Sequence, residues 1–531
     1  MRLWTLLERA ARLYPRQELV EHGRVRTYAE ALARCERLDA FLRARGLAPG
    51  ERVSVLSWNS IEYLELYFAA ARGGLVLNPL NVRLAAPELA EILLDCGARL
   101  LFVEPAFAAL VRELLAPHAG REVPRALEAV VWLGPRPASS GIGLAEHELE
   151  PLCTGSAAIP PPVAAALDGV AHLYYTSGTT GRSKGVMLTQ RNVATHALGT
   201  LGELGLSDAD SWAHIAPMFH LADAWATFAM TWCGGRHVFL PRFEPEAALE
   251  LLVRERATIT NLVPTMLNLM VRHPSARGRD YSGLRAILSG GAPIAPALVH
   301  EIVELFGCEY VQTYGMTETS PYLTLSVLKS ALRELPRAER LHFQAKTGRP
   351  FATVELRVVD ESGRDVPADA RTVGEIRVRG ESVTPGYWNR PAETAAAFED
   401  GWLKTGDLAT IDAEGYVEIV DRKKDMILTG GENVYSTEVE HALYAHPQVL
   451  EAAVYGLPDP VWGERVCAAV VLRPGQSCRS EELQAFCRER LAAYKVPRAI
   501  EFLAELPRTG SGKITKHVLR ERARDPKRHL G

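Results

Sequence analysis

The stretch Tyr174–Gly185, YYTSGTTGRSKG, concentrates flexible backbone, hydroxyl groups and one cation in a short segment. Glycine permits backbone conformations that aim several N–H groups at one anion, and Lys184 adds a positive charge. This combination predicts a loop that binds phosphate. A mobile Ser/Thr/Gly linker has a similar composition, so the stretch alone leaves both interpretations open.

The spacing of the glycines excludes two well-known phosphate-binding motifs. The pattern G-x-x-x-x-G-K-[S/T] does not fit, because Gly178 and Gly181 are too close together and Gly185 follows the lysine. The dinucleotide pattern G-x-G-x-x-G is absent from the stretch as well. A phosphate loop here therefore belongs to another family of nucleotide-using proteins.

The composition is that of a globular enzyme with several domains. The chain has 531 residues, of which 47% are apolar and 23% charged, and a net charge of −4. We find no basic stripe that would favour nucleic acid and no polybasic run that would favour an anionic membrane. The expected partners are therefore small molecules.

Eight cysteines are scattered through the chain without a C-x-x-C pair, which argues against a zinc site and against a disulfide framework. Residues 1–15 are typical of an amphipathic helix rather than a signal peptide, and no apolar run is long enough to cross a membrane. We expect a soluble cytoplasmic protein, and the sequence leaves a homodimer open.

The first half of the chain alternates apolar strands with amphipathic helices. Residues 52–57 and 98–104 are predicted strands, and 60–74 is a predicted helix closed by glycine. This order predicts βαβ units and a mostly parallel sheet. The Ala-, Pro- and Gly-rich residues 116–168 are expected to form a long surface excursion before the glycine loop.

Further along, residues 211–320 form a second α/β run with glycines at strand ends. From residue 347 the pattern changes to alternating strands separated by turns. After 421–425 the chain mixes helices and strands in a compact segment, so a domain boundary is expected there.

Several segments now align with the opening loop. They are APMFH (216–220), SGGAP (289–293), QTYGMTETS (312–320), TGD (405–407), DRKKDMILTGGENVYSTEVE (421–440) and PRTGSGKI (507–514). In this order and spacing they resemble the adenylate-forming superfamily, which includes acyl-CoA synthetases, aryl-CoA ligases, peptide-synthetase adenylation domains and beetle luciferases. The resemblance covers essentially the whole chain.

The resemblance implies an α/β fold with a large N-terminal portion of two α/β subdomains plus a β subdomain. A small mobile α+β C-terminal domain follows, so the domains would be 1–423 and 424–531. The implied reaction has two halves. A carboxylate attacks the α-phosphate of ATP to give acyl-AMP and pyrophosphate, and a thiol, that of coenzyme A in the ligases, then displaces AMP.

By resemblance, the opening loop cradles the phosphates of ATP. Its implied contacts are Thr176, Ser177, Gly178, Thr179, Thr180, Gly181 and Lys184. Ser183 is a departure, since the family usually has proline there. Glu318 would bind Mg²⁺, together with the hydroxyl of Thr176, and Thr317 would contact the α-phosphate.

Lys513 resembles the lysine that catalyses adenylation in this family, where a flexible ammonium group can bridge the carboxylate and the α-phosphate. The implied AMP-binding residues are Gly291, Ala292, Pro293, Gln312, Thr313, Tyr314, Gly315, Asp407 and Arg422. Tyr314 would stack on adenine, and Asp407 would accept hydrogen bonds from the ribose.

Three further roles follow from the resemblance. His220 would guard the passage between the acid and the thiol, although a packed structural histidine would look the same in sequence. Lys424 would be the hinge of the C-terminal domain. Gly430 and Gly431 would line the coenzyme A tunnel, and a simple hairpin with a glycine turn is compatible with that role.

The acyl pocket is expected around Leu221, Ala222, Trp225 and Val263, which are mostly small or apolar. These residues favour a medium- or long-chain fatty acid. Asp223 is a departure that either points away from the pocket or binds a polar substituent, so an aryl or hydroxylated acid stays open.

Three functions are therefore weighed. The first is an acyl-CoA synthetase that uses ATP, Mg²⁺ and coenzyme A. The second is an enzyme that delivers the activated acid to a carrier-protein thiol or an amine; the absence of a carrier-like segment favours coenzyme A. The third is a non-catalytic adenylate binder, against which the intact Lys513 and Glu318 argue.

Overall fold

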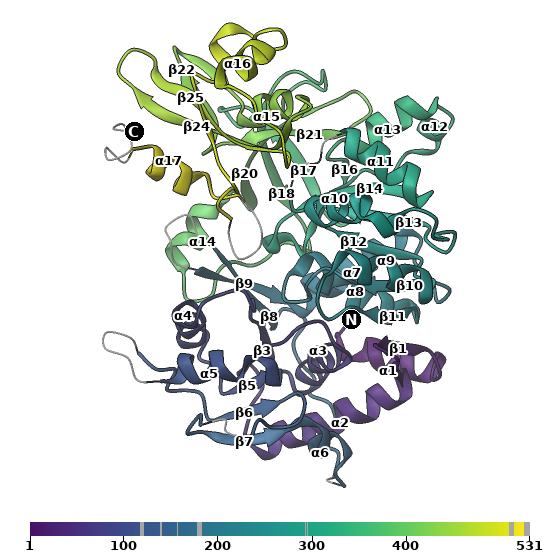
Figure 1. Cartoon of the computed structure of the whole chain (residues 1–531). Coiled ribbons are helices and arrows are strands. Elements are labelled where there is room, and N and C mark those ends of the chain that lie inside the picture. The colour runs from purple at the N-terminus through teal and green to yellow at the C-terminus, as the bar shows by residue number, and fades with distance from the viewer. Residues whose placement is uncertain are drawn as a thin grey trace. The chain divides into compact units, whose positions relative to one another are not determined.

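The computed structural model describes residues 1–116, 122–138, 141–156, 158–177, 183–292, 294, 296–508 and 514–524. The chain divides into two compact units (Figure 1). The first comprises Met1–Glu355 and Val378–Leu403, and the second comprises Leu356–Arg377 and Lys404–Gly531. The boundary at 423/424 that the resemblance implies stays a prediction.

A seven-stranded sheet forms the first half of the first unit, in the order β7-β6-β5-β3-β4-β8-β9. Its strands are parallel except for the antiparallel pair β8 and β9. The strands are β3 (Arg52–Leu56), β4 (Val76–Pro79), β5 (Leu100–Val103), β6 (Ala129–Trp132), β7 (Ala145–Glu148), β8 (Val170–Ser177) and β9 (Ser183–Thr189).

The expected surface excursion at 116–168 is wrong in part. Strand β6 pairs with β5 and strand β7 pairs with β6, so this region extends the sheet. The signal was missed because the fully buried run Ala129–Trp132 is short and is surrounded by Ala-, Pro- and Gly-rich sequence.

The second sheet of this unit has nine strands, in the order β16-β15-β14-β13-β12-β10-β11-β1-β2. Its central strands β11, β10, β12, β13 and β14 run parallel. The strands are β1 (Glu18–Glu21), β2 (Arg24–Thr27), β10 (Ser211–His214), β11 (Arg236–Phe239), β12 (Ile259–Leu262), β13 (Ala286–Ser289), β14 (Glu309–Gly315), β15 (Tyr322–Leu325) and β16 (Arg349–Pro350).

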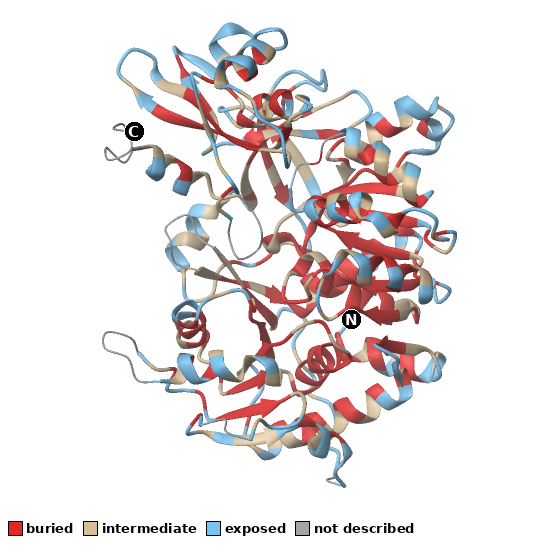
Figure 2. Ribbon diagram, in the orientation of Figure 1, coloured by how far each residue is buried: buried red, intermediate tan, exposed pale blue. Residues whose placement is uncertain are grey.

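Helices cover both sheets of the first unit, and one apolar core joins the two sheets through α1, α3, α7 and α8. The central strands of both sheets are buried along most of their length (Figure 2). The helices are α1 (Trp4–Leu13), α2 (Tyr28–Ala44), α3 (Ile61–Gly73), α4 (Ala86–Cys96), α5 (Ala108–Leu115), α6 (Leu149–Thr154), α7 (Gln190–Leu204), α8 (Leu221–Cys233), α9 (Pro245–Arg254), α10 (Pro264–Arg272), α11 (Pro296–Phe306), α12 (Ser330–Arg333), α13 (Arg337–Ala345) and α14 (Pro391–Ala397), with 3₁₀ turns η1 (Pro105–Phe107), η2 (Pro274–Ala276) and η3 (Thr317–Thr319).

Two five-stranded sheets complete the fold. In one, the order is β17-β18-β20-β19, with β21 on β20; in the other it is β23-β22-β25-β24, with β26 on β25. The elements are β17 (Glu355–Val359), β18 (Gly374–Arg379), β19 (Phe398–Glu399), β20 (Trp402–Ile411), β21 (Val417–Arg422), β22 (Ile427–Thr429), β23 (Glu432–Val434), β24 (Val449–Asp459), β25 (Gly463–Leu472), β26 (Ala499–Phe502), α15 (Ser436–Tyr444), α16 (Ser480–Arg488), η4 (Ala493–Lys495) and α17 (Lys516–Arg524). Two α/β subdomains, a β subdomain and an α+β C-terminal part confirm the expected fold class.

All eight cysteines are free thiols. Within the described ranges, no helix combines the length and the apolar character that crossing a membrane requires.

Candidate active site

The predicted site residues of the first unit follow the carboxyl ends of neighbouring parallel strands. His220 follows β10, Val263 comes directly after β12, Gly291 follows β13, and Tyr314 lies at the end of β14. Because parallel strands end at the same edge of their sheet, these segments are brought together. Open α/β sheets bind ligands at this edge.

Glu318, the predicted metal ligand, lies in η3 and is 7% exposed. The Tyr387 hydroxyl donates a hydrogen bond to its Oε1 atom at 2.9 Å. The ammonium group of Lys184 lies 5.3 Å from the centroid of the Tyr387 ring, within the range of a cation–π interaction. Tyr387 therefore connects the predicted metal ligand with the predicted phosphate-binding lysine.

Tyr387 reaches this position because its backbone pairs with β9. Met187 donates to the carbonyl of Gly386 at 3.1 Å, and Trp388 donates to the carbonyl of Gly185 at 2.8 Å. Burial and the Glu318 carboxylate raise the pKa of Tyr387 above its usual value, so the phenol stays protonated. Sequence reasoning missed this residue, and the stretch TPGYWNR carries no periodic signal that would have found it.

The predicted phosphate loop lies in the sequence between β8 and β9, which pair with each other. Thr176 lies opposite Lys184 and Ser177 lies opposite Ser183 in the antiparallel register. A hairpin holds the two ends of such a loop at a fixed separation. Four predicted contacts lie outside the described residues: Gly178, Thr179, Thr180 and Gly181.

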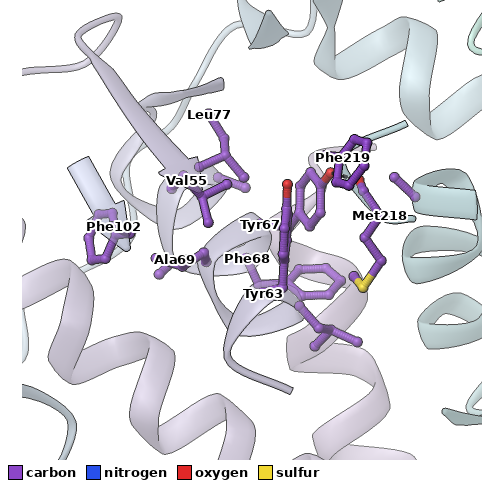
Figure 3. Packing of buried hydrophobic residues seen from close by; sticks show 14 of the residues in the cluster. Val55, Tyr63, Tyr67, Phe68, Ala69, Leu77, Phe102, Met218 and Phe219 are labelled. Atoms are coloured by element: carbon purple, nitrogen blue, oxygen red, sulfur yellow. Dashed lines mark hydrogen bonds between the residues drawn. The ribbon is translucent and has the colours of Figure 1, made fainter. Parts of the chain in front are cut away.

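Tyr67 on α3 joins this hairpin to the segment that carries His220. Its hydroxyl is 2.6 Å from the Tyr174 hydroxyl and donates to the carbonyl of Met218 at 3.1 Å. Tyr67 lies beside Met218 and Phe219 in the buried cluster (Figure 3). The fully buried phenol therefore fixes the strand before the loop relative to the APMFH segment.

Asn59 fixes the same segment from the other side. Its amide nitrogen donates to the carbonyls of His214 and Ala216 at 3.0 and 2.9 Å, and its oxygen accepts from the N–H of Met218 at 2.7 Å. Three hydrogen bonds therefore join the buried Asn59 to the segment from His214 to Met218. Sequence reasoning missed Asn59, since a single asparagine before a helix normally indicates a cap.

The predicted AMP-binding residues of this unit surround the end of β14. Thr313 donates from its hydroxyl to the Ser289 carbonyl at 3.1 Å, and Gln312 accepts from the Tyr310 hydroxyl at 2.5 Å. Gly315 must be glycine, because an added Cβ would lie 1.9 Å from the Pro321 carbonyl oxygen. The remaining residues of the set in this unit are the half-buried Tyr314 and the exposed Gly291 and Ala292; Pro293 lies outside the described residues. Thr317, the predicted α-phosphate contact, is half-buried in η3.

The predicted acyl-pocket residues lie at the start of α8 and the end of β12. Leu221 is buried, and Ala222 and Val263 are half-buried. Trp225 is 1% exposed, and its ring lies 4.8 Å from that of Trp212 and 5.2 Å from that of Tyr322. Trp225 is therefore packed tightly among other buried aromatic rings.

Asp223 points into the protein interior rather than towards a ligand. Its carboxylate accepts from the Trp212 indole at 3.1 Å and pairs with Nδ1 of His214 at 2.6 Å. The chain of contacts continues from His214 to His237 at 2.9 Å. All four side chains are fully buried, so Asp223 is used structurally and the alternative of a polar substituent at Asp223 is wrong.

In the second unit, the predicted ribose acceptor and its neighbour form an ion pair. Asp407 and Arg422 are paired residues of β20 and β21, and their side chains lie 3.1 Å apart. Asp407 is buried and Arg422 is exposed. The arrangement fixes the carboxylate that would accept from ribose.

The other predicted residues of this unit lie on turns. Lys424 is exposed between β21 and β22, and Gly430 and Gly431 form the turn between β22 and β23 with φ angles of 61° and 83°. This is the hairpin with a glycine turn that the sequence left compatible with a tunnel. Lys513 lies outside the described residues, within a segment whose ends are joined by a β-bridge between Arg508 and Ile514.

A magnesium site would rest on one carboxylate. Among the residues that the structure describes, no group of three or more His, Cys, Asp or Glu could hold a metal ion. Mg²⁺ commonly takes one or two carboxylates together with substrate phosphates and water. Glu318, which lies in η3 after the carboxyl end of β14, fits that requirement. Its role as a metal ligand stays a prediction.

The chain matches known proteins over almost its whole length. The family model for AMP-binding enzymes matches residues 7–388, and the model for the AMP-binding enzyme C-terminal domain matches 438–513. A feruloyl-CoA synthase from Amycolatopsis sp. is 40% identical over 97% of both chains, and a long-chain-fatty-acid–CoA ligase from Thermus thermophilus is 38% identical over 98% of this chain and 95% of that protein. The o-succinylbenzoate CoA synthetase of Bacillus subtilis in complex with its acyl-adenylate superposes with a TM-score of 0.81 at 30% identity, covering 99% and 98% of the chains.

The chain belongs to the family of AMP-binding enzymes. The expectation of an AMP-forming acid–thiol ligase that uses ATP and coenzyme A is thereby confirmed. The family does not decide which acid is activated, and the individual roles of the site residues stay predictions.

Proposed function

We propose that the protein activates an aryl carboxylic acid as its adenylate and transfers it to coenzyme A. The observation that carries this choice is the group of aromatic rings around Trp225, a predicted acyl-pocket residue that is buried and packs edge-to-face against Trp212 and Tyr322. Flat aromatic surfaces favour a flat ligand, since offset and edge contacts between rings add to apolar burial. The similarity to a feruloyl-CoA synthase supports the same choice.

The proposal assigns the phosphates of ATP to the β8–β9 hairpin and the metal to Glu318. Lys184 would supply the fixed positive charge beside the phosphates, and Thr317 would donate to the α-phosphate. Preorganised donors of this kind stabilise the charge that develops during transfer at phosphorus. Lys513 would arrive from the second unit for adenylation, and Gly430 and Gly431 would serve the thiol step, with Lys424 as the hinge at the 423/424 boundary.

A medium- or long-chain fatty acid is the second candidate. The half-buried Ala222 and Val263 offer small apolar surfaces that suit an alkyl chain, and a relative is named for long-chain fatty acids. The Trp225 indole, however, donates to the Ala222 carbonyl at 3.0 Å, and a rigid ring at this position suits a short flat acid better than a long chain.

The test is a panel of aryl acids and of fatty acids with six to sixteen carbons, scored for AMP release with and without coenzyme A. We expect the highest kcat/KM with an aryl acid and release that depends on coenzyme A. A preference for fatty acids would favour the second candidate. Release that ignores coenzyme A would favour delivery to a carrier protein or an amine.

Location and assembly belong to the same proposal. Free thiols throughout the chain suit a reducing compartment, which supports the cytoplasm. A homodimer stays an expectation, and light scattering of the purified protein would test it.

A further inference from the structure

A carboxylate lies in the last turn of α4, where the helix dipole disfavours a negative charge. Asp95 is the next-to-last residue of this helix, and its side chain is 18% exposed. The carbonyl groups at the end of a helix carry partial negative charge, so a carboxylate beside them is unfavourable unless cations or donors compensate it. The partners of Asp95 supply that compensation, and they lead to the predicted ATP site.

The two carboxylate oxygens of Asp95 bind two segments that are far apart in the chain. The Tyr175 hydroxyl donates to Oδ2 at 2.6 Å, and the Arg390 guanidinium donates to Oδ1 at 2.8 Å. Burial and the Asp95 carboxylate raise the pKa of Tyr175, so its phenol stays protonated and donates. Tyr175 directly precedes Thr176 of the predicted phosphate loop, and Arg390 follows Tyr387 by three residues.

The backbone carbonyl of Asp95 binds the second of these segments as well. It accepts from the Trp388 indole at 3.1 Å and from the Asn389 amide at 3.4 Å. The carbonyls of the last helical turn have no partner within the helix, so this one can accept from outside it. Asp95 therefore joins the strand before the phosphate loop to the three residues that follow Tyr387.

Strand β9 is confined between the same two segments. Gly185 pairs with Tyr175 in the antiparallel register, and its carbonyl accepts from the N–H of Trp388 at 2.8 Å. A Cβ added at Gly185 would lie 2.9 Å from Cζ of Tyr175 and 3.3 Å from Cβ of Trp388. The backbone next to Lys184 is therefore held between two residues that Asp95 binds.

We propose that Asp95 is a positioning residue for ATP: it fixes the strand that enters the predicted phosphate loop relative to the segment that carries Tyr387. This inference rests on the proposed function, which assigns the phosphates of ATP to this loop and the metal to Glu318. Asp95 acts through its partners and not by touching ATP. Because the Tyr387 hydroxyl donates to Glu318, the carboxylate of Asp95 keeps the phosphate donors and the metal ligand in register before ATP binds.

The place of this network predicts which ligands depend on it. ATP carries the β- and γ-phosphates that the loop would bind, whereas AMP and acyl-AMP lack them. Loss of the Asp95 carboxylate should therefore weaken the binding of ATP and slow adenylation. The affinity for AMP and thioester formation from supplied acyl-AMP should stay close to those of the wild type, whereas general damage to the unit would lower all four.

Asp95→Asn is the first variant, since it keeps the size of the side chain and the backbone contacts and removes the charge. Calorimetry gives the affinities for ATP and AMP, and pyrophosphate exchange gives KM for ATP. We expect both Kd and KM for ATP to rise about five- to tenfold, as for the loss of one hydrogen bond to a charged group. An unchanged affinity for ATP, or an equal loss of affinity for ATP and AMP, overturns the inference.

Tyr175→Phe removes one of the same hydrogen bonds from the other side. It should also weaken ATP binding and spare AMP binding, and the double variant should be little worse than Asp95→Asn alone, because the two groups act as one unit. Fully additive effects on ATP affinity would show that the two residues act independently and would overturn the inference.

Asp210→Asn is the matched control. Asp210 also joins distant segments, since it accepts from Arg285 at 2.7 Å and from the Thr258 hydroxyl at 2.8 Å. These residues lie at the amino ends of β10, β13 and β12, at the opposite edge of the sheet from the predicted site. The variant should be less stable than the wild type but keep its ratio of ATP to AMP affinity, and an equal change of that ratio in Asp210→Asn and Asp95→Asn overturns the inference.

Lys184→Ala separates a failure of this inference from a failure of the proposed function. If this variant binds ATP more weakly and Asp95→Asn does not, only the positioning role is overturned. If neither variant changes the affinity for ATP, the assignment of the phosphates to the loop is wrong, and the inference is overturned with it.

Discussion

The site residues of the first unit project from the ends of buried strands, whereas those of the second unit lie mainly on turns at its surface. Glu318 is buried and receives a hydrogen bond from Tyr387, and Tyr67 and Asn59 fix the segments beside it. Lys424, Gly430 and Gly431 are exposed. Asp407 is the exception, since it is buried and paired with Arg422.

This difference separates two kinds of task. A binding framework gains from rigid, satisfied groups, because preorganised donors need no rearrangement when charge develops. Groups that serve only one half-reaction must be able to move into and out of the active site, and turns and exposed loops permit such movement. Substitutions in the first unit should therefore affect both half-reactions, and substitutions on the turns of the second unit should affect one.

The largest difference between the effects on the two half-reactions is expected for Lys513→Ala. Loss of the ammonium group should lower the rate of acyl-AMP formation by about 10²–10³-fold, in the range seen when one stabilising group is removed. Thioester formation from supplied acyl-AMP should stay largely intact. Pyrophosphate exchange and AMP release measured separately would show this, and an equal loss of both half-reactions would contradict the division of tasks.

Most of the framework could be predicted from the sequence, because glycines at strand ends and 2- or 3.6-residue periodicity are local signals. The alternating strands after residue 347 and the helix at the N-terminus are found as expected. Tyr387 and Asn59 could not be predicted, since each contacts partners far away in the chain. Strand β6 was missed because its buried run is too short to show a period.

Glu318→Gln is the matching test in the first unit. The amide keeps the size of the side chain and removes the charge that would hold Mg²⁺, so acyl-AMP formation should fall about 100-fold. ATP affinity measured by calorimetry at several Mg²⁺ concentrations gives a readout apart from turnover. A variant whose ATP affinity responds to Mg²⁺ like the wild type would argue against the role of Glu318.

Acid should destabilise the first unit through two buried histidines. Burial lowers the pKa values of His172 and His196 to about 3, below the ordinary value of 6.5. The unfolded chain therefore binds more protons than the native protein between pH 6.5 and 3. As the pH is lowered through that window, the free energy of unfolding should decrease by up to about 1.4 kcal/mol per histidine per pH unit.

Calorimetry between pH 7.5 and 5 would measure this slope. In the native protein the N–H of Tyr322 donates to the imidazole of His196 at 3.3 Å. His196→Gln keeps an acceptor for this N–H and should make the free energy of unfolding depend less steeply on pH than in the wild type. Equal slopes for the two proteins would show that protonation of His196 does not limit acid stability.

Tyr387→Phe tests whether the buried framework is preorganised by its phenol. The variant keeps the ring beside Lys184 and removes the hydrogen bond to Glu318, so acyl-AMP formation should fall about tenfold, the usual cost of one hydrogen bond to a charged group. The apparent Mg²⁺ requirement should rise, since Glu318 is less well positioned. Tyr281→Phe serves as the control, because this phenol is buried in another apolar core of the same unit and donates to the Ala276 carbonyl. An unchanged Mg²⁺ requirement in Tyr387→Phe would reduce Tyr387 to a packing role.

Gly431→Ala gives the smallest expected effect and the sharpest test of the second unit. An added Cβ meets no atom within 4 Å, so the only penalty is the φ angle of 83°, which costs a non-glycine residue about 1 kcal/mol. If the turn approaches the pantetheine arm, transfer to coenzyme A should slow about three- to fivefold while acyl-AMP formation is unchanged.

Gly475→Ala is the matched control, since Gly475 has a φ of 75° and equally open surroundings on another turn of the same unit. Equal effects of the two substitutions on thioester formation would mean that strain in this unit, and not the tunnel, sets the rate.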